Sequence, residues 1–300
     1  MNKENIELPH FNQTTLATLF YETKRSKLLF SEYITSQPLP LQQRFMAILD
    51  SVNQRWASSY LYAIPNQGLK QVMSPQEFRA NLALRLLIPK FSGEKICSRP
   101  KCSSPMDSFG NHALNCGGRY RTLRHNEVAY ALNALAHDAQ LRPRLNAPVQ
   151  CLGLSSQYGT SDAGLHSLTA FRPADILLDW DHLPRRTCVD VTIVSPLLAH
   201  MPVKFVPGKV ARIAENSKYA KHSMACSDAG FGFVGFAADA FGCFGPSAIQ
   251  MLKRIAHMLE TTKSYPPYLA ANIVFRRISF AIHLGVARQM VARREHDVYF

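Results

Sequence analysis

The order of helical and extended apolar segments between residues 121 and 262 restricts the fold of this chain more than any other feature. One helical pattern is followed by three extended segments, then by a helix, a further strand and a last helix. In chain order the segments are Leu123–Ala139, Val149–Leu154, Ala174–Trp180, Thr187–Val194, Lys209–Cys226, Phe231–Ala237 and Ser247–Glu260. This α-β-β-β-α-β-α order predicts an α/β fold with a small mixed sheet flanked by helices.

The regions on either side of this core have different patterns. Residues 1–92 show apolar residues at helical spacing, and Ser74 followed by Pro75 predicts the start of a helix there. Residues 93–120 are rich in Gly, Ser, Pro and Cys and predict a loop without a core of its own. Residues 263–300 carry arginines on an apolar pattern and predict a basic amphipathic helical tail. We therefore expect a helical N-terminal region, a small loop module, the core over 121–262 and this tail.

Composition favours a polyanionic partner and a reducing compartment. Lys and Arg outnumber Asp and Glu by 34 to 21, and each phosphate that such a chain neutralises releases condensed counterions. The seven cysteines are odd in number and unevenly spaced, which does not suit a disulfide framework. The polar N-terminus lacks a secretory pattern, and the glycine-rich stretch Gly230–Gly245 is a poor bilayer span. We expect a soluble intracellular protein with no membrane partner.

Four potential metal ligands lie together in the loop. Cys97, Cys102, His112 and Cys116 have the spacing C-x4-C-x9-H-x3-C, and three sulfurs with one imidazole can close a tetrahedral Zn²⁺ site. A loop with few apolar residues would gain its order largely from the metal. The alternative is three free cysteines with an incidental histidine. The pattern predicts a small zinc knuckle with a structural rather than a catalytic ion.

A basic run follows the loop directly. Arg119, Arg121, Arg124 and His125 would place positive charge beside the metal and suit contacts to phosphates. Their alternative role is an ordinary solvated helix face.

Two aspartates stand where apolar strand residues would be expected. Asp175 lies in the segment Arg-Pro-Ala-Asp that begins at Arg172, and Asp190 lies in Cys-Val-Asp-Val-Thr. Burying a carboxylate is costly unless a cation or several donors meet it. If the two strands are neighbours, both carboxylates can converge on Mg²⁺, which prefers oxygen ligands. The alternatives are a strand-end turn residue and a structural ion pair with arginine.

Glu127 is a further candidate ligand, or else an ordinary exposed helix carboxylate.

In this order the motifs resemble a known family. The Cys-Cys-His-Cys loop, Arg124-His125-Asn126, Arg172 to Asp175, Asp190 to Thr192 and Lys218-Tyr219 are similar to the restriction-like endonuclease region of site-specific non-LTR retrotransposon proteins. That region belongs to the PD-(D/E)xK nuclease superfamily. The resemblance covers roughly residue 63 to the C-terminus.

The resemblance implies a restriction-endonuclease-like fold and a catalytic role for several residues. Asp175 and Asp190 would be the acidic pair that binds Mg²⁺. Thr192 occupies the strand position of the usual lysine, so Lys218 on the following helix would replace it, with Lys209 and Lys221 as alternatives. Arg119, Arg121, Arg124, His125 and Arg172 would contact nucleic acid.

Three hypotheses about function follow from these residues. The first is a Mg²⁺-dependent DNA endonuclease derived from a retrotransposon, which would nick target DNA in the nucleus and have DNA and element RNA as its partners. The chain lacks the Tyr-x-Asp-Asp polymerase motif and looks like a C-terminal portion of such a protein. The second is a noncatalytic nucleic-acid-binding remnant whose nuclease site has decayed. The third is a purely structural interaction protein without affinity for nucleic acid.

Overall fold

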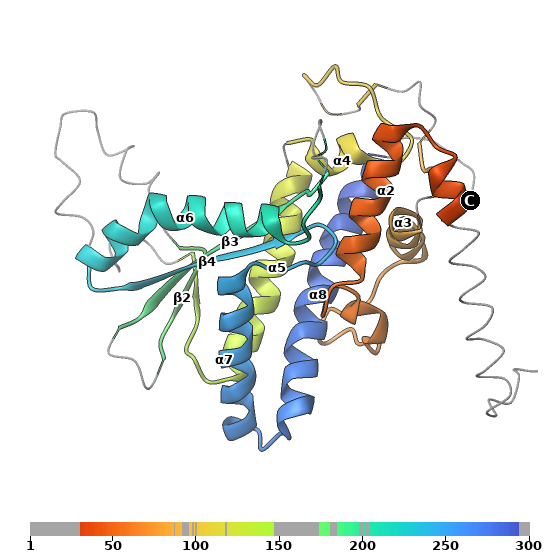
Figure 1. The fold of residues 1–300 in the computed structure, drawn as a ribbon. Coiled ribbons are helices and arrows are strands. Elements are labelled where there is room, and N and C mark those ends of the chain that lie inside the picture. The colour runs from red at the N-terminus through yellow and green to blue at the C-terminus, as the bar shows by residue number, and fades with distance from the viewer. Residues whose placement is uncertain are drawn as a thin grey trace, which may run out of the picture. The chain divides into compact units, whose positions relative to one another are not determined.

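The computed structural model describes residues 31–86, 88–91, 96–97, 99, 101–117, 119–146, 174–180, 185–197, 201 and 204–293, without the side chains of residues 119 and 120 (Figure 1). Its contacts group the chain into two units, Met1–Met46 and Ala47–Phe300. In the first unit residues 31–35 are helical and helix α2 (Leu39–Val52) begins. The rings of Tyr33 and Phe45 stack there with centroids 6.2 Å apart. The second unit holds every predicted site residue that the structure describes.

Helices make up most of the second unit. Ser74 caps α3 as predicted, because its hydroxyl accepts from the backbone N–H of Glu77 while the Glu77 carboxylate accepts from the N–H of Ser74. The helical elements after α2 are η1 (Ser59–Tyr62), α3 (Pro75–Arg85), α4 (Asn111–Asn115), α5 (Arg119–Asp138), α6 (Lys209–Asp228), α7 (Pro246–Thr262) and α8 (Pro267–Val291).

A small mixed sheet lies among these helices. Its strands are β1 (Arg144–Leu145), β2 (Ile176–Leu178), β3 (Thr187–Val194) and β4 (Gly232–Asp239), in the spatial order β1-β2-β3-β4. β2 runs antiparallel to β1 and β3, whereas β3 and β4 are parallel and are connected through α6. The α/β class with a mixed sheet flanked by helices is thus confirmed. The strand predicted at Val149–Leu154 lies outside the described residues.

The central strand is buried on both faces, which explains its continuous apolar pattern. Of the eight residues in β3, six are buried, and only Thr192 and Val194 are partly exposed. Helix α6 covers one face of the sheet and α5 and α7 lie on the other (Figure 1). Asp190 is therefore a carboxylate in a strand that is otherwise packed like a core strand.

Helix α8 is the centre of the helical layer and corrects one expectation. The sequence predicted a basic amphipathic tail, but 15 of the 25 residues of α8 are buried. It packs against α5, α7, α3 and η1. Its closest approach to α5 is at Gly285, where an added Cβ would stand 2.8 Å from the Cα of Arg124. Arg277 and Arg288 of α8 form ion pairs with carboxylates of other helices. Arg276 lies over the ring of Tyr62. The described arginines of α8 are thus engaged with other parts of the protein.

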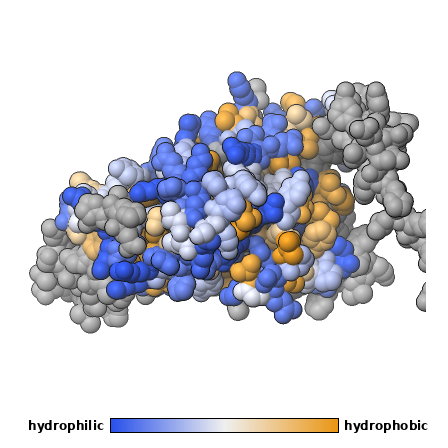
Figure 2. Space-filling model, turned by 90° about the horizontal axis from the view of Figure 1, so that it is seen from below, coloured by the Kyte–Doolittle hydropathy of each residue, from blue (hydrophilic) through white to orange (hydrophobic). Residues whose placement is uncertain are grey.

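Helix α8 is also long and apolar enough to cross a membrane. However, 72% of the most apolar part of this helix is buried inside the protein. The face seen in Figure 2 is mainly hydrophilic, with smaller hydrophobic areas between the polar ones. Burial against neighbouring helices accounts for the composition of α8 without a bilayer.

The turn after β4 depends on a buried carboxylate. Asp239 is 0% exposed, and its Oδ1 accepts hydrogen bonds from the backbone N–H groups of Phe241 and Cys243, both at 2.9 Å. Burial outweighs these bonds and raises the pKa of Asp239 to about 6. A folded pKa above the unfolded value means that Asp239 contributes stability at low pH, which is lost as the pH rises toward 6.

We predict that Asp239→Asn will gain stability relative to the wild type as the pH is raised from 4 to 7. The amide can still accept the two N–H groups but carries no charge, so the relative gain should reach about 1–3 kcal/mol. Urea unfolding across this pH range measures it. Asp228→Asn, which removes the same charge from an exposed position, is the control. A difference that does not change with pH would contradict the prediction.

Candidate functional site

Two aspartates lie at neighbouring positions where β2 and β3 pair. Ile176 pairs with Val189 in the antiparallel ladder of β2 and β3, and the N–H of Asp175 donates to the carbonyl of Val189 at 2.9 Å. The carboxylate of Asp175 also accepts a hydrogen bond from the N–H of Val191. Asp175 thus bonds to the residues on both sides of Asp190, and the two members of the predicted metal pair are neighbours.

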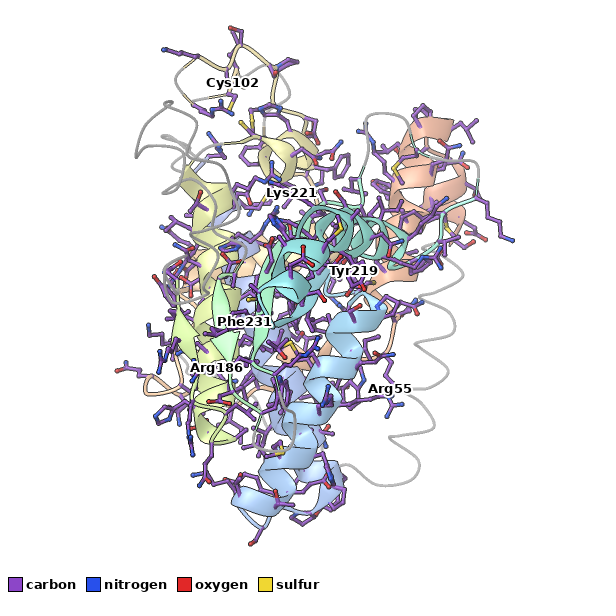
Figure 3. The ribbon with its side chains drawn as sticks, turned by 90° about the vertical axis from the view of Figure 1, so that its left-hand side faces the viewer. Arg55, Cys102, Arg186, Tyr219, Lys221 and Phe231 are labelled. Carbon is purple, nitrogen blue, oxygen red and sulfur yellow. The ribbon has the colours of Figure 1, made fainter. Side chains whose placement is uncertain are left out.

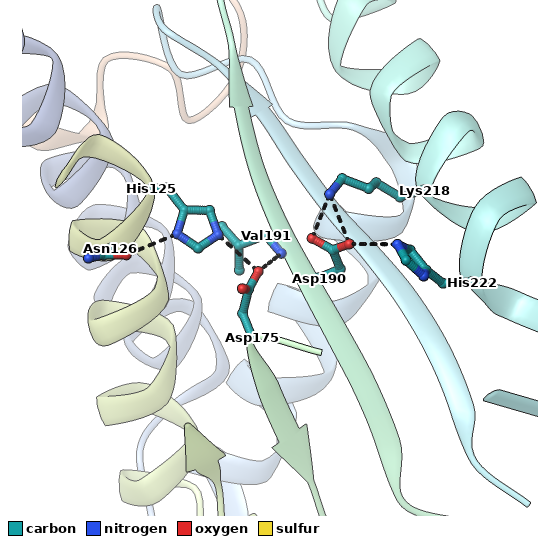
Figure 4. A network of polar contacts seen from close by, with 7 residues as sticks. All are labelled: His125, Asn126, Asp175, Asp190, Val191, Lys218 and His222. Atoms are coloured by element: carbon teal, nitrogen blue, oxygen red, sulfur yellow. Dashed lines mark hydrogen bonds and ion pairs between the residues drawn. The ribbon is translucent and has the colours of Figure 1, made fainter. Parts of the chain in front are cut away.

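Helix α6 supplies the basic partners of Asp190 (Figure 4). The Nζ of Lys218 lies 3.0 Å from Oδ1 and 2.9 Å from Oδ2 of the carboxylate. The Nε2 of His222 lies 3.6 Å from Oδ2. Lys218 and His222 are four residues apart, so they project from one side of the helix. That spacing was a readable indication, but the sequence analysis passed over His222.

Asp175 has its basic partner on helix α5. Its Oδ2 lies 2.9 Å from the Nε2 of His125 and accepts a 2.7 Å hydrogen bond from the N–H of Val191 (Figure 4). The other ring nitrogen of His125 lies 3.1 Å from the Oδ1 of Asn126. His125 was expected to contact nucleic acid, and the structure instead joins it to the first aspartate.

Burial and charge act in opposite directions on the two carboxyl groups. Burial raises the pKa of Asp190, and Lys218 only partly offsets it. Burial also acts to raise the pKa of Asp175, but the hydrogen bonds and charge of His125, with the N–H of Val191, hold that pKa below its usual value. Burial acts to lower the pKa of His125, and Asp175 reverses this, so the pKa is raised. These environments push two neighbouring carboxyls apart in pKa, as is common at functional sites.

The site is open to solvent on one side. The side chains of Asp175 and Lys218 are 24% and 32% exposed, whereas that of Asp190 is 9% exposed. A ligand could therefore reach Asp175 and Lys218 without a change of fold. Of the lysines named as alternatives, Lys209 begins α6 and Lys221 is exposed on the same helix. Only Lys218 among the three contacts a candidate metal ligand in the described structure.

Glu127 is not brought to the two aspartates, which corrects the expectation of a third acidic ligand. Its carboxylate forms an ion pair with Arg288 of α8. Arg288 also lies 3.0 Å from the carboxylate of Glu77 on α3. Positions two residues apart on an α-helix point in directions about 200° apart. Glu127 therefore faces the helical layer, whereas His125 faces the sheet. Arg288 thus joins α3, α5 and α8 through the two carboxylates.

The predicted phosphate contacts divide into three groups. Arg124 is 2% exposed and donates to the carbonyls of Leu114 at 3.3 Å and Ile193 at 2.9 Å, so its expected role in holding nucleic acid is wrong. Burial lowers the pKa of Arg124 to about 10, which leaves it charged at neutral pH. Arg121 is exposed and remains available. Arg172 and the side chain of Arg119 lie outside the described residues.

The predicted metal ligands of the loop come together. The ligand atoms of Cys97, Cys102, His112 and Cys116, here called the Cys/His cluster, all lie within 4.8 Å of one another. The sulfurs of Cys97 and Cys116 are 3.7 Å apart, and the sulfur of Cys102 lies 3.6 Å from Nε2 of His112. This cluster could hold a metal ion.

Local hydrogen bonds bring the four ligands into place. The N–H of Cys97 donates to Ser104 and that of Cys102 donates to Arg99, both at 3.0 Å, which folds the first two ligands into a tight loop. Asp107 accepts the N–H groups of Asn111 and His112 at the start of α4. Figure 3 shows Cys102 in the loop beyond α4.

Helix α8 anchors the Cys/His cluster to the core. Gln289 donates to the carbonyls of Ala113 and Leu114 at 2.7 and 3.2 Å. Arg293 lies 3.6 Å from the sulfur of Cys97, and Arg99 lies 3.7 Å from that of Cys116. Guanidinium groups beside thiolates offset the negative charge of a three-thiolate site.

No protein-family model matches the chain, and a search of curated proteins finds no match either.

We predict that the purified protein binds one metal ion per chain through the Cys/His cluster. Cys116→Ser should lose the ion, and a strong chelator should lower the unfolding temperature, because the loop has little core of its own. Elemental analysis and thermal unfolding measure the two effects. Cys188→Ala, which removes a buried thiol outside the cluster, is the matched control and should keep the ion. Equal metal content in all three proteins would contradict the assignment.

Proposed function

We propose that this chain is a Mg²⁺-dependent DNA endonuclease with a PD-(D/E)xK type of site and a structural zinc centre. The observation that carries the proposal is the proximity of Asp175 and Asp190, since Asp175 bonds to both chain neighbours of Asp190, together with Lys218 at Asp190. Two acidic groups and a lysine at one solvent-open point of a mixed sheet are the groups that phosphodiester hydrolysis needs.

The element order supports this proposal together with the residues. The chain runs through α5, then β1 to β3, then α6 and β4. Asp175 directly precedes β2, Asp190 lies in β3 and Lys218 lies in α6. This arrangement agrees with the resemblance to restriction-like endonucleases. A fold by itself does not supply an activity, so the proposal rests on the residues.

The two aspartates fit a divalent cation by their chemistry. Carboxylate oxygens are the ligands that Mg²⁺ prefers, and the carboxylates of Asp175 and Asp190 would hold it. When bound, such an ion lowers the pKa of a coordinated water and stabilises charge on the phosphate. His125 contacts the carboxylate of Asp175 and Lys218 contacts that of Asp190, so each carboxylate has a basic partner.

The residues of the chain have distinct parts in this reaction. His125 orients Asp175 through a 2.9 Å contact and fixes which oxygen remains free. Lys218 is the accessible cation and would stabilise negative charge that develops on the phosphate oxygens. His222 is buried beside Asp190 and positions that carboxylate.

The Cys/His cluster fits zinc better than other common ions. Zn–S bonds of about 2.3 Å and Zn–N bonds of about 2.0 Å set tetrahedral S···S and S···N separations at about 3.8 and 3.5 Å. The observed separations are 3.7 and 3.6 Å. Four protein ligands leave no position for substrate, so the ion would be structural.

The surface of α6 supports a nucleic acid as the partner. Lys209, Arg212 and Lys221 are exposed on this helix, and its one carboxylate before Asp228, that of Glu215, is buried. The net charge of +13 acts in the same direction. DNA in the nucleus is the substrate that we propose.

A second candidate is a noncatalytic nucleic-acid-binding protein. One observation favours it: Thr192 stands at the strand position of the usual lysine, and both carboxylates already have basic partners. Salt-sensitive DNA binding without metal-dependent cleavage, over several DNA structures, would establish this alternative.

We predict that Asp190→Asn will abolish Mg²⁺-dependent nicking of supercoiled plasmid. The amide preserves size but removes one of the two charges that hold the ion. Gel analysis of relaxed and linear plasmid measures the activity, and circular dichroism shows that the variant is folded. Asp179→Asn, which changes an aspartate paired with Arg186 on the same sheet, should keep wild-type activity. Equal nicking by Asp190→Asn would reject the site.

We further predict that Lys218→Met will lower the nicking rate by about 10²–10³ while metal binding persists. The reason is that the lysine acts on the charge of the phosphate and not as a metal ligand. Single-turnover cleavage and calorimetric Mg²⁺ titration separate the two effects. Lys221→Met removes the same charge one turn away and should change the rate much less. An equal loss of nicking rate in both variants would contradict a specific role of Lys218 and indicate that only the overall positive charge of the helix matters.

A further inference from the structure

A cavity lies along β4. Its volume is about 450 Å³, and it is lined by residues of α6, β4 and α7 together with Trp180 and Thr187. The larger side chains of this lining include Trp180, Asn216, Tyr219, Phe233, Gln250 and Arg254. We call this cavity the edge groove. Its size is within the range of pockets that take a small ligand.

The backbone of β4 contributes donors and acceptors to the edge groove. β4 is the last strand in the sheet order, so only one of its edges is paired. The N–H of Gly232 donates to the carbonyl of Arg186 at 2.8 Å, toward β3. Alternation along the strand then turns the N–H and carbonyl groups of Phe233 and Gly235 toward the groove. Further along, Gly245 pairs with Ala237 and closes the edge.

Flat side chains flank this edge from both helices. Tyr219 of α6 is 60% exposed, and its ring lies 6.3 Å from that of Phe233. The guanidinium of Arg254 on α7 lies over the ring of Trp180 at 4.7 Å. One face of this guanidinium is covered by the indole, while the residue itself is exposed. Aromatic rings and guanidinium planes are the groups on which unpaired bases stack.

Charge favours an anionic ligand in the edge groove. Among its described lining residues Glu215 is the one acidic residue, and it is 4% exposed. Its two oxygens accept the N–H groups of Ser247 and Ala248 at 3.2 and 2.9 Å, which occupies them at the start of α7. Arg254 therefore carries the accessible charge, and Asn216 and Gln250 add amide donors and acceptors.

We propose that the edge groove is a subsite for an unpaired nucleotide of a single strand, with its base stacked on Tyr219 and its phosphate at Arg254. This inference deepens the proposed function, because it names single-stranded DNA as a ligand of the same protein. The described lining of the groove does not include Asp175, Asp190 or Lys218, although its Gly235 pairs with Asp190 in the sheet. Changes to Tyr219 and Arg254 therefore leave the three residues of the nuclease proposal unaltered.

The test is fluorescence anisotropy with a labelled 12-residue oligodeoxythymidylate and an abasic strand of the same length, without added Mg²⁺. Tyr219→Ala and Arg254→Gln should each weaken binding of the thymidylate strand about ten-fold. Tyr219→Ala should leave binding of the abasic strand unchanged, because that strand has no base to stack. Circular dichroism checks that each variant is folded.

Two matched controls share the chemistry but not the location. Tyr268→Ala removes a tyrosine that is 71% exposed on α8, and Arg55→Gln removes a guanidinium that lies 4.7 Å over Trp56. In Figure 3 Arg55 lies apart from Tyr219 and Phe231. Both controls should bind the thymidylate strand as the wild type does. Equal losses in controls and groove variants would overturn the proposal.

The outcome can be separated from that of the nuclease proposal. Asp190→Asn should bind the thymidylate strand with wild-type affinity, since the groove does not contain that residue. Absence of nicking together with base-dependent binding would reject the nuclease site and retain the groove. Nicking by the wild type, together with unchanged binding in Tyr219→Ala and Arg254→Gln, would reject the groove and retain the nuclease site. Equal affinity of the wild type for the thymidylate and abasic strands would also overturn the groove.

Discussion

The pairing of β2 with β3 is the contact on which the candidate site depends. It sets two aspartates next to each other, where their like charges would repel in a partly buried environment. Lys218 of α6 and His125 of α5 offset this repulsion, and these helices lie on opposite faces of the sheet. Both flanking helices must therefore be present for the strands to carry the two charges.

Helix α8 connects parts of the chain that are remote in sequence. Gly285 admits the backbone of α5, Arg288 holds Glu127, and Gln289 with Arg293 anchors the Cys/His cluster. Because α5 also carries His125, the cluster and the aspartate pair share one rigid support. A metal ion in the cluster would then stabilise the same helical layer that orients Asp175. Arg288 and Arg293 thus connect separate parts of the protein.

Prediction from sequence was accurate where the local pattern dominates. The bounds of β3 coincide with the predicted segment Thr187–Val194, and α6 begins at the predicted Lys209. The capping box at Ser74 and the four members of the Cys/His cluster were also readable, because short-range hydrogen bonds and ligand spacing determine them. Arg124 and Glu127 were misjudged, since nothing local tells a charged residue on a helix whether another helix will cover it.

Alternation, capping and ligand spacing are local properties, so the sequence by itself determined β3, the start of α6, the two aspartates and the four residues of the Cys/His cluster. The tertiary structure alone decided which charges meet. His125 contacts Asp175 across 50 residues, and Arg288 reaches Glu127 across 161. It also decided that α8 is a core helix and that one edge of β4 remains open. These outcomes depend on how helices cover surfaces formed by distant segments, and no periodicity along the chain records that packing.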